Sequence, residues 1–180
     1  SPSAISVPRV PAWAVPRTPA DSDVEAAYIA SSALNSLDNL VRSDPLWIGA
    51  WRQRLALKCA AAAVALAGRT ETEAQLRDAW HLRQPGAEPG PAGNIFAAWR
   101  RMAARSTVVD AAALRAAVDL LGLRWSEDLA ALPERLDDIV RTGRPAPLVA
   151  AAIVTEVQRC RPEASLLGWW LADQALARRM

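Results

Sequence analysis

Apolar side chains recur every three or four residues along most of the chain beyond residue 20, as they do on one face of an α-helix. Segment 21–42 opens with Asp and Ser, which are favourable helix caps, and with acids that suit the positive end of a helix. Its apolar stripe consists of Val24, Tyr28, Leu34, Leu37 and Val41. We therefore predict a first amphipathic helix over this segment.

A second apolar stripe predicts a helix between Asp44 and Gly68. Asp44 is suited to cap the helix, Pro45 to occupy its first position and Gly68 to follow its last residue. The side chains expected to face the core are Trp47, Trp51, Leu55, Cys59, Ala62 and Leu66. Thr70 and Glu73 then have the spacing of a capping box, which predicts a third helix directly afterwards.

Similar patterns predict further helices in the second half of the chain. Their expected ranges are 92–105, 110–122, 133–143, 147–160 and 162 to the C-terminus. No β-branched run alternates with a period of two for long enough to predict a strand. The sequence thus predicts an all-α protein, with seven or eight helices packed as an irregular, orthogonal or bundle-like single domain.

The first 20 residues differ from the remainder because they contain Pro2, Pro8, Pro11, Pro16 and Pro19. Each proline lacks a backbone donor and disfavours helical geometry in the residue before it. We predict an extended Pro-rich arm over 1–20 and a helical domain over 21–180. Trp13 is the expected anchor of the arm on the helical body.

Composition adds an expectation about the core. Hydrophobic residues make up 52% of the chain and aromatic residues only 6%, because much of the apolar content is alanine, the best helix former. Trp accounts for 8 aromatic residues, beside one Phe and one Tyr, so we expect Trp to supply most of the bulky core volume. No apolar run approaches the roughly 18 residues of a membrane span, and no signal-peptide pattern is present. We expect a cytoplasmic protein without membrane partners.

The charge balance argues against a strongly electrostatic nucleic-acid binder, since 21 basic and 19 acidic residues give a net charge of +2. Cys59 and Cys160 lack the spacing of zinc ligands, and His81 is the single histidine. We therefore expect two reduced, buried thiols, no metal site and no cofactor.

The main candidate site lies in the segment HLRQPGAEPGPAGNIFAAWRR, residues 81–101. Its glycines lead into a predicted helix, whose first backbone amides attract anions. The residues predicted to bind a phosphate or nucleotide are Arg77, Arg83, Gly90, Gly93, Asn94 and Arg100. A P-loop is excluded because the GxxxxGK[ST] pattern and a preceding strand are both absent. The alternative is a rigid corner, in which prolines restrict the unfolded chain and glycines allow the turn.

A second site hypothesis concerns His81 and Asp78, whose spacing places them on one helix face. Such a pair can orient a histidine for acid–base catalysis. No Ser or Cys nucleophile lies nearby in sequence. A histidine near the end of a helix is more commonly a partner of the helix dipole, so this is the weaker hypothesis.

The block AGRTETEAQLRDAWHLRQPGAEPGPAGNIFAAWR, residues 67–100, resembles part of a bacterial family known only as a domain of unknown function. The resemblance continues through LLGLRWSEDLAALPERLDDIVRTGRPAPLVAAAIVTEV to WWLADQALA and covers nearly the whole chain. It implies an accessory protein of a bacterial, often plasmid-encoded system, and a chain that corresponds to the N-terminal portion of longer members or to a short form. The family has no assigned activity, so the resemblance implies no catalytic residue.

A Trp-rich helical body without a coherent catalytic set favours a non-enzymatic module that binds another protein or a second copy of itself. Binding of a phosphate, a nucleotide or nucleic acid at the helix start 90–94 is the first alternative. An enzyme that uses His81 and Asp78 is the second.

Overall fold

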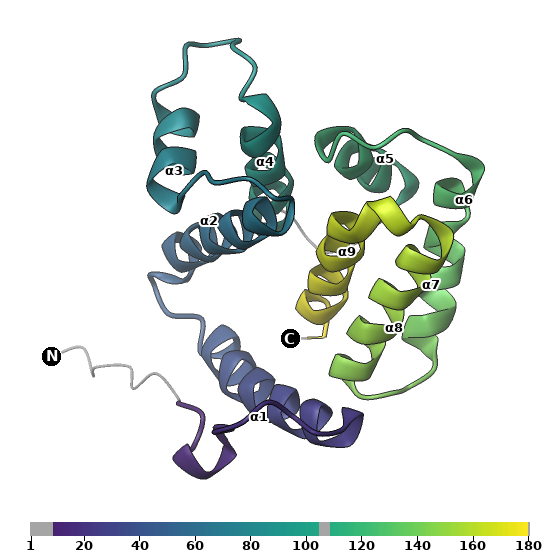
Figure 1. Ribbon diagram of the computed structural model, residues 1–180. Helices are drawn as coiled ribbons and strands as arrows, with labels where there is room; N and C mark the ends of the chain where they lie inside the picture. The colour runs from purple at the N-terminus through teal and green to yellow at the C-terminus, as the bar shows by residue number, and fades with distance from the viewer. Residues whose placement is uncertain (1–8, 105–108, 180) are drawn as a thin grey trace, which may run out of the picture.

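A computed structural model describes residues 9–104 and 109–179, and within these ranges the fold is all-α, as predicted (Figure 1). The helices are α1 (Asp23–Arg42), α2 (Ile48–Leu66), α3 (Glu73–His81), α4 (Gly90–Ala104), α5 (Ala111–Leu120), α6 (Glu127–Ala130), α7 (Leu132–Arg141), α8 (Ala146–Cys160) and α9 (Ser165–Ala177). Two 3-10 turns, Ala12–Ala14 and Pro162–Ala164, precede α1 and α9.

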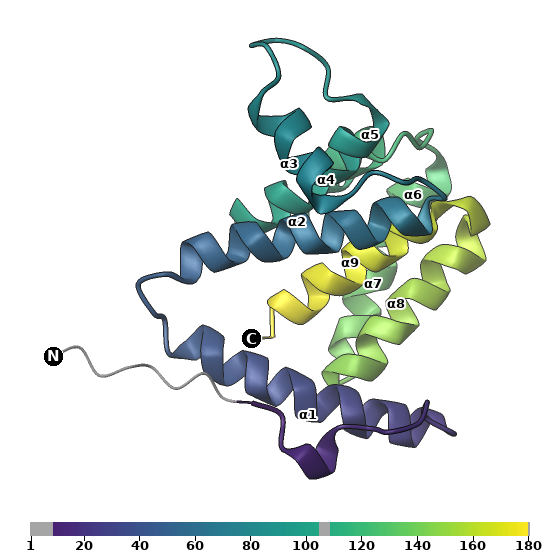
Figure 2. The ribbon, with the colours of Figure 1, turned by 60° about the vertical axis from the view of Figure 1, so that its left-hand side comes forward.

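Helix α9 lies at the centre of the fold, between α2 on one side and α8 on the other (Figures 1 and 2). The most extensive helix contacts are those of α8 with α9 and of α2 with α4. Trp170 of α9 joins the two halves, because its indole N–H donates to the Ala98 carbonyl of α4 at 3.1 Å. Helix α1 lies apart from α2 and contacts the other helices mainly through α8.

Local signals set several helix boundaries where the sequence predicts them. The Ser22 hydroxyl caps α1 by accepting the backbone N–H three residues further on at 3.2 Å. The Asp110 carboxylate caps α5 in the same way at 2.7 Å. Gly68 follows the last turn of α2, and its N–H donates to a carbonyl of that turn at 3.0 Å. Caps of this kind depend on near neighbours in sequence and are therefore readable before the fold is known.

The N-cap residues predicted for α2 and α3 are wrong by three and two residues. Helix α2 begins at Ile48, after a turn in which Asp44 has a φ of 39° and therefore does not cap the helix. The capping box of α3 starts at Thr72 and uses Gln75, rather than starting at Thr70. Two capping-box patterns overlap in this segment, and the one nearer the helix forms.

The core consists mainly of aliphatic side chains, so the expectation of a tryptophan core is wrong. The largest fully buried side chains are Leu76, Leu114, Leu129, Leu132, Ile153, Leu167 and Leu171. Of the tryptophans, Trp99 and Trp170 are buried, whereas Trp13 is 75% exposed and does not anchor the arm. Its neighbour Ala14 is the buried residue there. Trp is large and carries an N–H that needs a partner, so it is seldom fully buried.

Helix α2 presents its small side chains to the core and its bulky stripe elsewhere. Its buried residues are Ala56, Ala60, Ala63 and Val64. Small side chains at a helix contact allow the two axes to approach closely, which suits the extensive packing of α2 on α4. The predicted stripe that contains Trp51 is only partly covered and faces an open space between helices.

Across the ranges that the structure describes, no helix combines the length and the apolarity needed to cross a bilayer. The same residues contain no cluster of three His, Cys, Asp or Glu side chains that is able to hold a metal ion. Cys59 and Cys160 are free thiols, and both are half-buried rather than buried.

Candidate functional site

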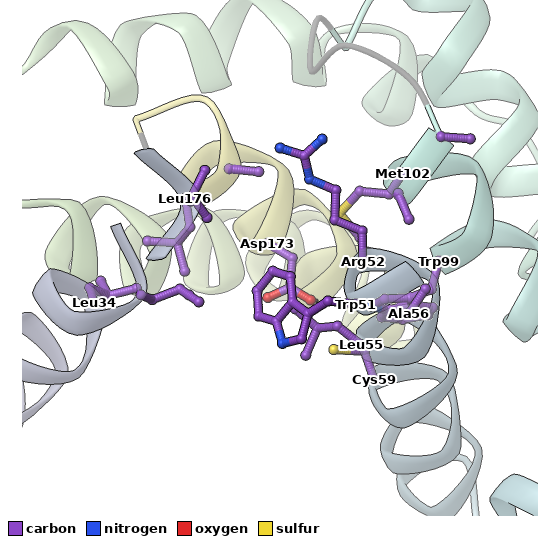
Figure 3. Close-up of a pocket in the computed structure, with 15 residues that line it drawn as sticks. Leu34, Trp51, Arg52, Leu55, Ala56, Cys59, Trp99, Met102, Asp173 and Leu176 are labelled. Carbon is purple, nitrogen blue, oxygen red and sulfur yellow. Dashed lines mark hydrogen bonds between the residues drawn. The ribbon is translucent and has the colours of Figure 1, made fainter. Parts of the chain in front are cut away.

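An open cavity of about 500 Å³ lies between α1, α2, α4 and α9 (Figure 3). Most of its lining is apolar, with aromatic surface from Trp51 and Trp99. The bulky aliphatic side chains of the lining are Leu34, Leu37, Val41, Leu55, Met102 and Leu176. Pockets that bind small molecules are typically about 300–1,000 Å³ and mainly apolar, with a few polar groups. The size and the lining of this cavity match that description.

The cavity exists because two amphipathic helices have apolar faces that no neighbour covers completely. Helix α2 contributes the stripe Trp51, Leu55 and Cys59. Helix α1 contributes Leu34 and its neighbours on the same face, and Leu40 is its single buried residue. Both stripes are visible in the sequence, but they meet a space rather than a packed core.

Asp173 is the one charged residue of α9, and it lines the cavity. One of its carboxylate oxygens accepts a hydrogen bond from the indole N–H of Trp99 at 3.2 Å. Among the described residues, no cation forms an ion pair with it. Burial raises the pKa of the Asp173 carboxyl, and the Trp99 hydrogen bond opposes that effect. The cavity therefore contains an acidic group that is poorly solvated in its charged form.

Two further titratable side chains line the cavity. Burial, together with the charge of Asp173, raises the pKa of the Cys59 thiol. The thiol therefore stays protonated at neutral pH, where only a thiolate is strongly nucleophilic. Arg52 is exposed, and its guanidinium points away from Asp173 (Figure 3). This lining resembles a binding pocket more than a nucleophile with its base.

The predicted site in residues 81–101 forms a packed corner between α3 and α4. A Cβ atom added to Gly93 would lie 2.6 Å from the Cβ of Pro89, so the loop closes directly onto the first turn of α4. Gly93 is buried, and Gly90 has a φ of 70°, which few other residues adopt. Asn94 is half-buried beside them. These glycines are explained by the turn and by the close approach of Pro89, without a ligand.

The arginines of the corner stack on its aromatic side chains. The guanidinium carbons of Arg83 and Arg100 lie 3.8 Å and 4.8 Å from the centroid of the Trp80 ring. Trp80 in turn meets Phe96 edge to face, with centroids 5.6 Å apart. Arg77 pairs with a neighbouring acid rather than with the loop. These contacts favour the corner interpretation, and anion binding at this helix start stays a prediction.

The two residues of the catalytic hypothesis do not form the predicted pair. Asp78 binds the guanidinium of Arg77 at 2.9 Å. His81 is exposed in the last turn of α3, and no hydrogen bond connects it to Asp78 in the described part of the chain. The adjacent arginine offers Asp78 a charged donor, which is a stronger partner than a neutral imidazole.

Sequence reasoning missed Asp173 and assigned the stripe of Trp51, Leu55 and Cys59 to the core. One signal was available, because Asp173 is the one charged residue in a helix whose other residues are mostly apolar. Such a helix is normally buried, and a charge within it requires a reason.

Comparison with known proteins gives one match. Residues 2–180 match a family described as "Protein of unknown function (DUF1403)". The chain belongs to this family. Neither the curated proteins nor the solved structures contain a match. The matched residues of this DUF1403 protein include both the corner and the cavity, so the family description does not choose between them.

Proposed function

We propose that this DUF1403 protein binds a small, largely apolar molecule in the cavity between α1, α2, α4 and α9. The observation that carries the proposal is the volume of about 500 Å³ with an apolar lining from four helices. Removal of apolar surface from water is favourable by roughly 25 cal/mol per Å², so the free energy of binding favours an occupant that covers this lining. If each of about 20 non-hydrogen atoms of a ligand contributes about 0.3 kcal/mol of binding free energy, the expected Kd is roughly tens of micromolar.

Helix α1 is the part of the wall that an occupant would stabilise most. Its face toward the cavity carries Leu34, Leu37 and Val41, whereas its packing on the other helices is mainly through α8. A bound apolar molecule would contact α1 and α2 together and so connect them. Ligand at 100 times its Kd adds about 2.7 kcal/mol to the free energy of unfolding.

The test uses phenylnaphthylamine, a neutral apolar dye whose fluorescence rises in apolar surroundings. We expect the dye to bind and to slow the reaction of Cys59 with N-ethylmaleimide, because Cys59 lines the cavity. A Cys160→Ser background leaves Cys59 as the single reactive thiol, since the chain contains two cysteines.

A matched pair of variants tests whether the dye binds in the cavity. Ala103→Phe adds a ring inside the cavity, and we expect it to weaken dye binding at least about tenfold by filling the volume. Ala33→Phe adds the same ring to an exposed position of α1 outside the cavity, and dye binding should not change. If a folded Ala103→Phe protein binds the dye as well as the wild type, the proposed site is wrong.

A docking surface for a second copy of the chain is the second candidate. Leu46 and Trp47 are both exposed in the turn that joins α1 to α2, with relative exposures of 106% and 40%. Tryptophan is enriched in protein interfaces, where one ring covers a large area. Sedimentation tests the idea: self-association should weaken in Trp47→Ser, and a wild-type protein that stays monomeric at high concentration would exclude it.

A further inference from the structure

We infer that the molecule bound in the cavity is an organic amine, whose protonated nitrogen pairs with Asp173 while its apolar body fills the remaining volume. This inference rests on the proposed function and assigns the chemical class of the ligand.

The charge of the cavity favours a cationic ligand. Among the described residues, Asp173 is the single acidic side chain of the lining, and its carboxylate accepts one hydrogen bond there, from Trp99. A carboxylate withdrawn from water is costly unless a cation or hydrogen-bond donors compensate it. Arg52, the one basic side chain that the described residues contribute to the lining, points away from the carboxylate (Figure 3). An ammonium group on the ligand supplies the missing partner.

The aromatic surface beside the carboxylate also favours a cationic ligand. Trp51 and Trp99 line the same cavity as Asp173. The face of an indole ring is the best aromatic partner for a cation. The hydrogen bond at 3.2 Å from Trp99 also holds the carboxylate in position within this lining. Carboxylate and indoles together favour a cation over a neutral polar group of similar size.

The charge of Asp173 disfavours an anionic ligand. A carboxylic acid or phosphate in the cavity would place a second negative charge near Asp173, and like charges at short range are unfavourable. The other titratable groups of the lining are Arg52 and Cys59, both on α2, and α1 and α4 contribute none. Since Cys59 stays protonated, Asp173 is the one group of the described lining that can carry a negative charge at neutral pH.

Three ligands of equal chain length test the assignment: decylamine, decanol and decanoate, each used below its aggregation concentration. Their dissociation constants are measured by calorimetry at pH 7 with the wild-type protein. We expect decylamine to bind at least about tenfold more tightly than decanol, because only the amine forms a hydrogen bond to Asp173 in which both partners are charged, and we expect decanoate to bind most weakly.

Asp173→Asn is the decisive variant, because the amide still accepts the Trp99 N–H but carries no charge. The preference for decylamine over decanol should fall to about threefold or less. Asp119→Asn, on the exposed surface of α5 and outside the cavity, should leave the preference unchanged.

The outcomes separate this inference from the proposed function. If phenylnaphthylamine and all three ten-carbon ligands fail to bind, the cavity is not a binding site and both statements are wrong. If the dye and decanol bind but decylamine has no advantage in the wild-type protein, the cavity binds apolar molecules and only the amine assignment is wrong. An advantage that persists unchanged in folded Asp173→Asn also overturns the role of Asp173. The wild-type comparison needs no substitution, so it decides the inference even if the variant does not fold.

Discussion

The corner between α3 and α4 and the cavity beside α9 differ in what occupies their space. In the corner, the chain fills its own turn: Pro89 closes on Gly93, and Arg83 and Arg100 stack on Trp80. In the cavity, side chains from four helices surround about 500 Å³ that none of the described side chains fills. The corner has the more unusual sequence, whereas the cavity has the space that a ligand requires.

This difference teaches that unusual sequence and available space are separate signals. Glycines, prolines and a lone histidine are prominent in a sequence, but a tight turn uses the first two for purely conformational reasons. A binding cavity is made of ordinary leucines and tryptophans, and only their arrangement distinguishes it from a core.

Gly93→Ala tests whether the corner is closely packed. Its Cβ would lie 2.6 Å from that of Pro89, so we expect a loss of about 1–3 kcal/mol in the free energy of unfolding. Gly49→Ala is the matched control, because nothing lies within 4 Å of its Cβ and α2 should gain about 0.4–1 kcal/mol. Urea denaturation measures both, and a neutral Gly93→Ala would show that Pro89 is free to move away from the first turn of α4.

Glu156 provides a carboxylate with cationic partners, for comparison with Asp173. It accepts hydrogen bonds from Arg159 at 2.8 Å and from Arg135 at 3.2 Å. The Arg159 hydrogen bond is the main reason that its pKa falls to about 2. Because the folded pKa is depressed, its stabilisation is present above the unfolded pKa of about 4.3 and is lost as the pH falls toward 2.

Glu156→Gln should therefore destabilise the protein by about 1 kcal/mol at pH 7, allowing for solvent screening of the exposed arginines. The difference in the free energy of unfolding between the variant and the wild type should shrink as the pH falls below about 4. Thermal unfolding across this pH range measures it, and a pH-independent difference would contradict the ion-pair explanation.

In the protein without ligand, Asp173→Asn should change the free energy of unfolding in the opposite direction to Glu156→Gln. Burial raises the folded pKa of Asp173, so its contribution is most favourable at low pH and is lost as the pH rises through that pKa. The variant should be more stable than wild type by about 1 kcal/mol at pH 7, and the two should converge in acid. A destabilised variant at neutral pH would show that the carboxylate already has a partner in the folded chain.

His81→Ala should have the smallest effect. The side chain is exposed, so we expect a change of less than about 0.5 kcal/mol in stability and none in the binding of phenylnaphthylamine or decylamine. Calorimetry with inorganic phosphate completes the comparison. Phosphate binding that depends on Arg83 and Arg100 would restore the corner as a site, whereas no binding would leave the cavity as the better candidate.

Prediction from sequence succeeded for features that depend on residues close together in the chain. A cap in the opening Asp and Ser stretch, the start of α5 at Asp110 and the end of α2 at Gly68 are all confirmed. It failed where two local solutions compete, as for the overlapping capping boxes at Thr70 and Thr72. It also failed for the face of α2, because both an alanine face and a tryptophan stripe are compatible with a helix in contact with others.

The sequence by itself determined an all-α chain, most of its helix boundaries and the apolar stripes of α1 and α2. These features follow from interactions among residues at most about five positions apart, which the order of the residues specifies directly. Only the tertiary structure decided that the alanine face of α2 packs on α4 while its bulky stripe meets α1 and Asp173 across a cavity. Trp51, Trp99 and Asp173 come from three helices. Their meeting depends on how whole helices pack, and the spacing of residues within one helix does not contain that information.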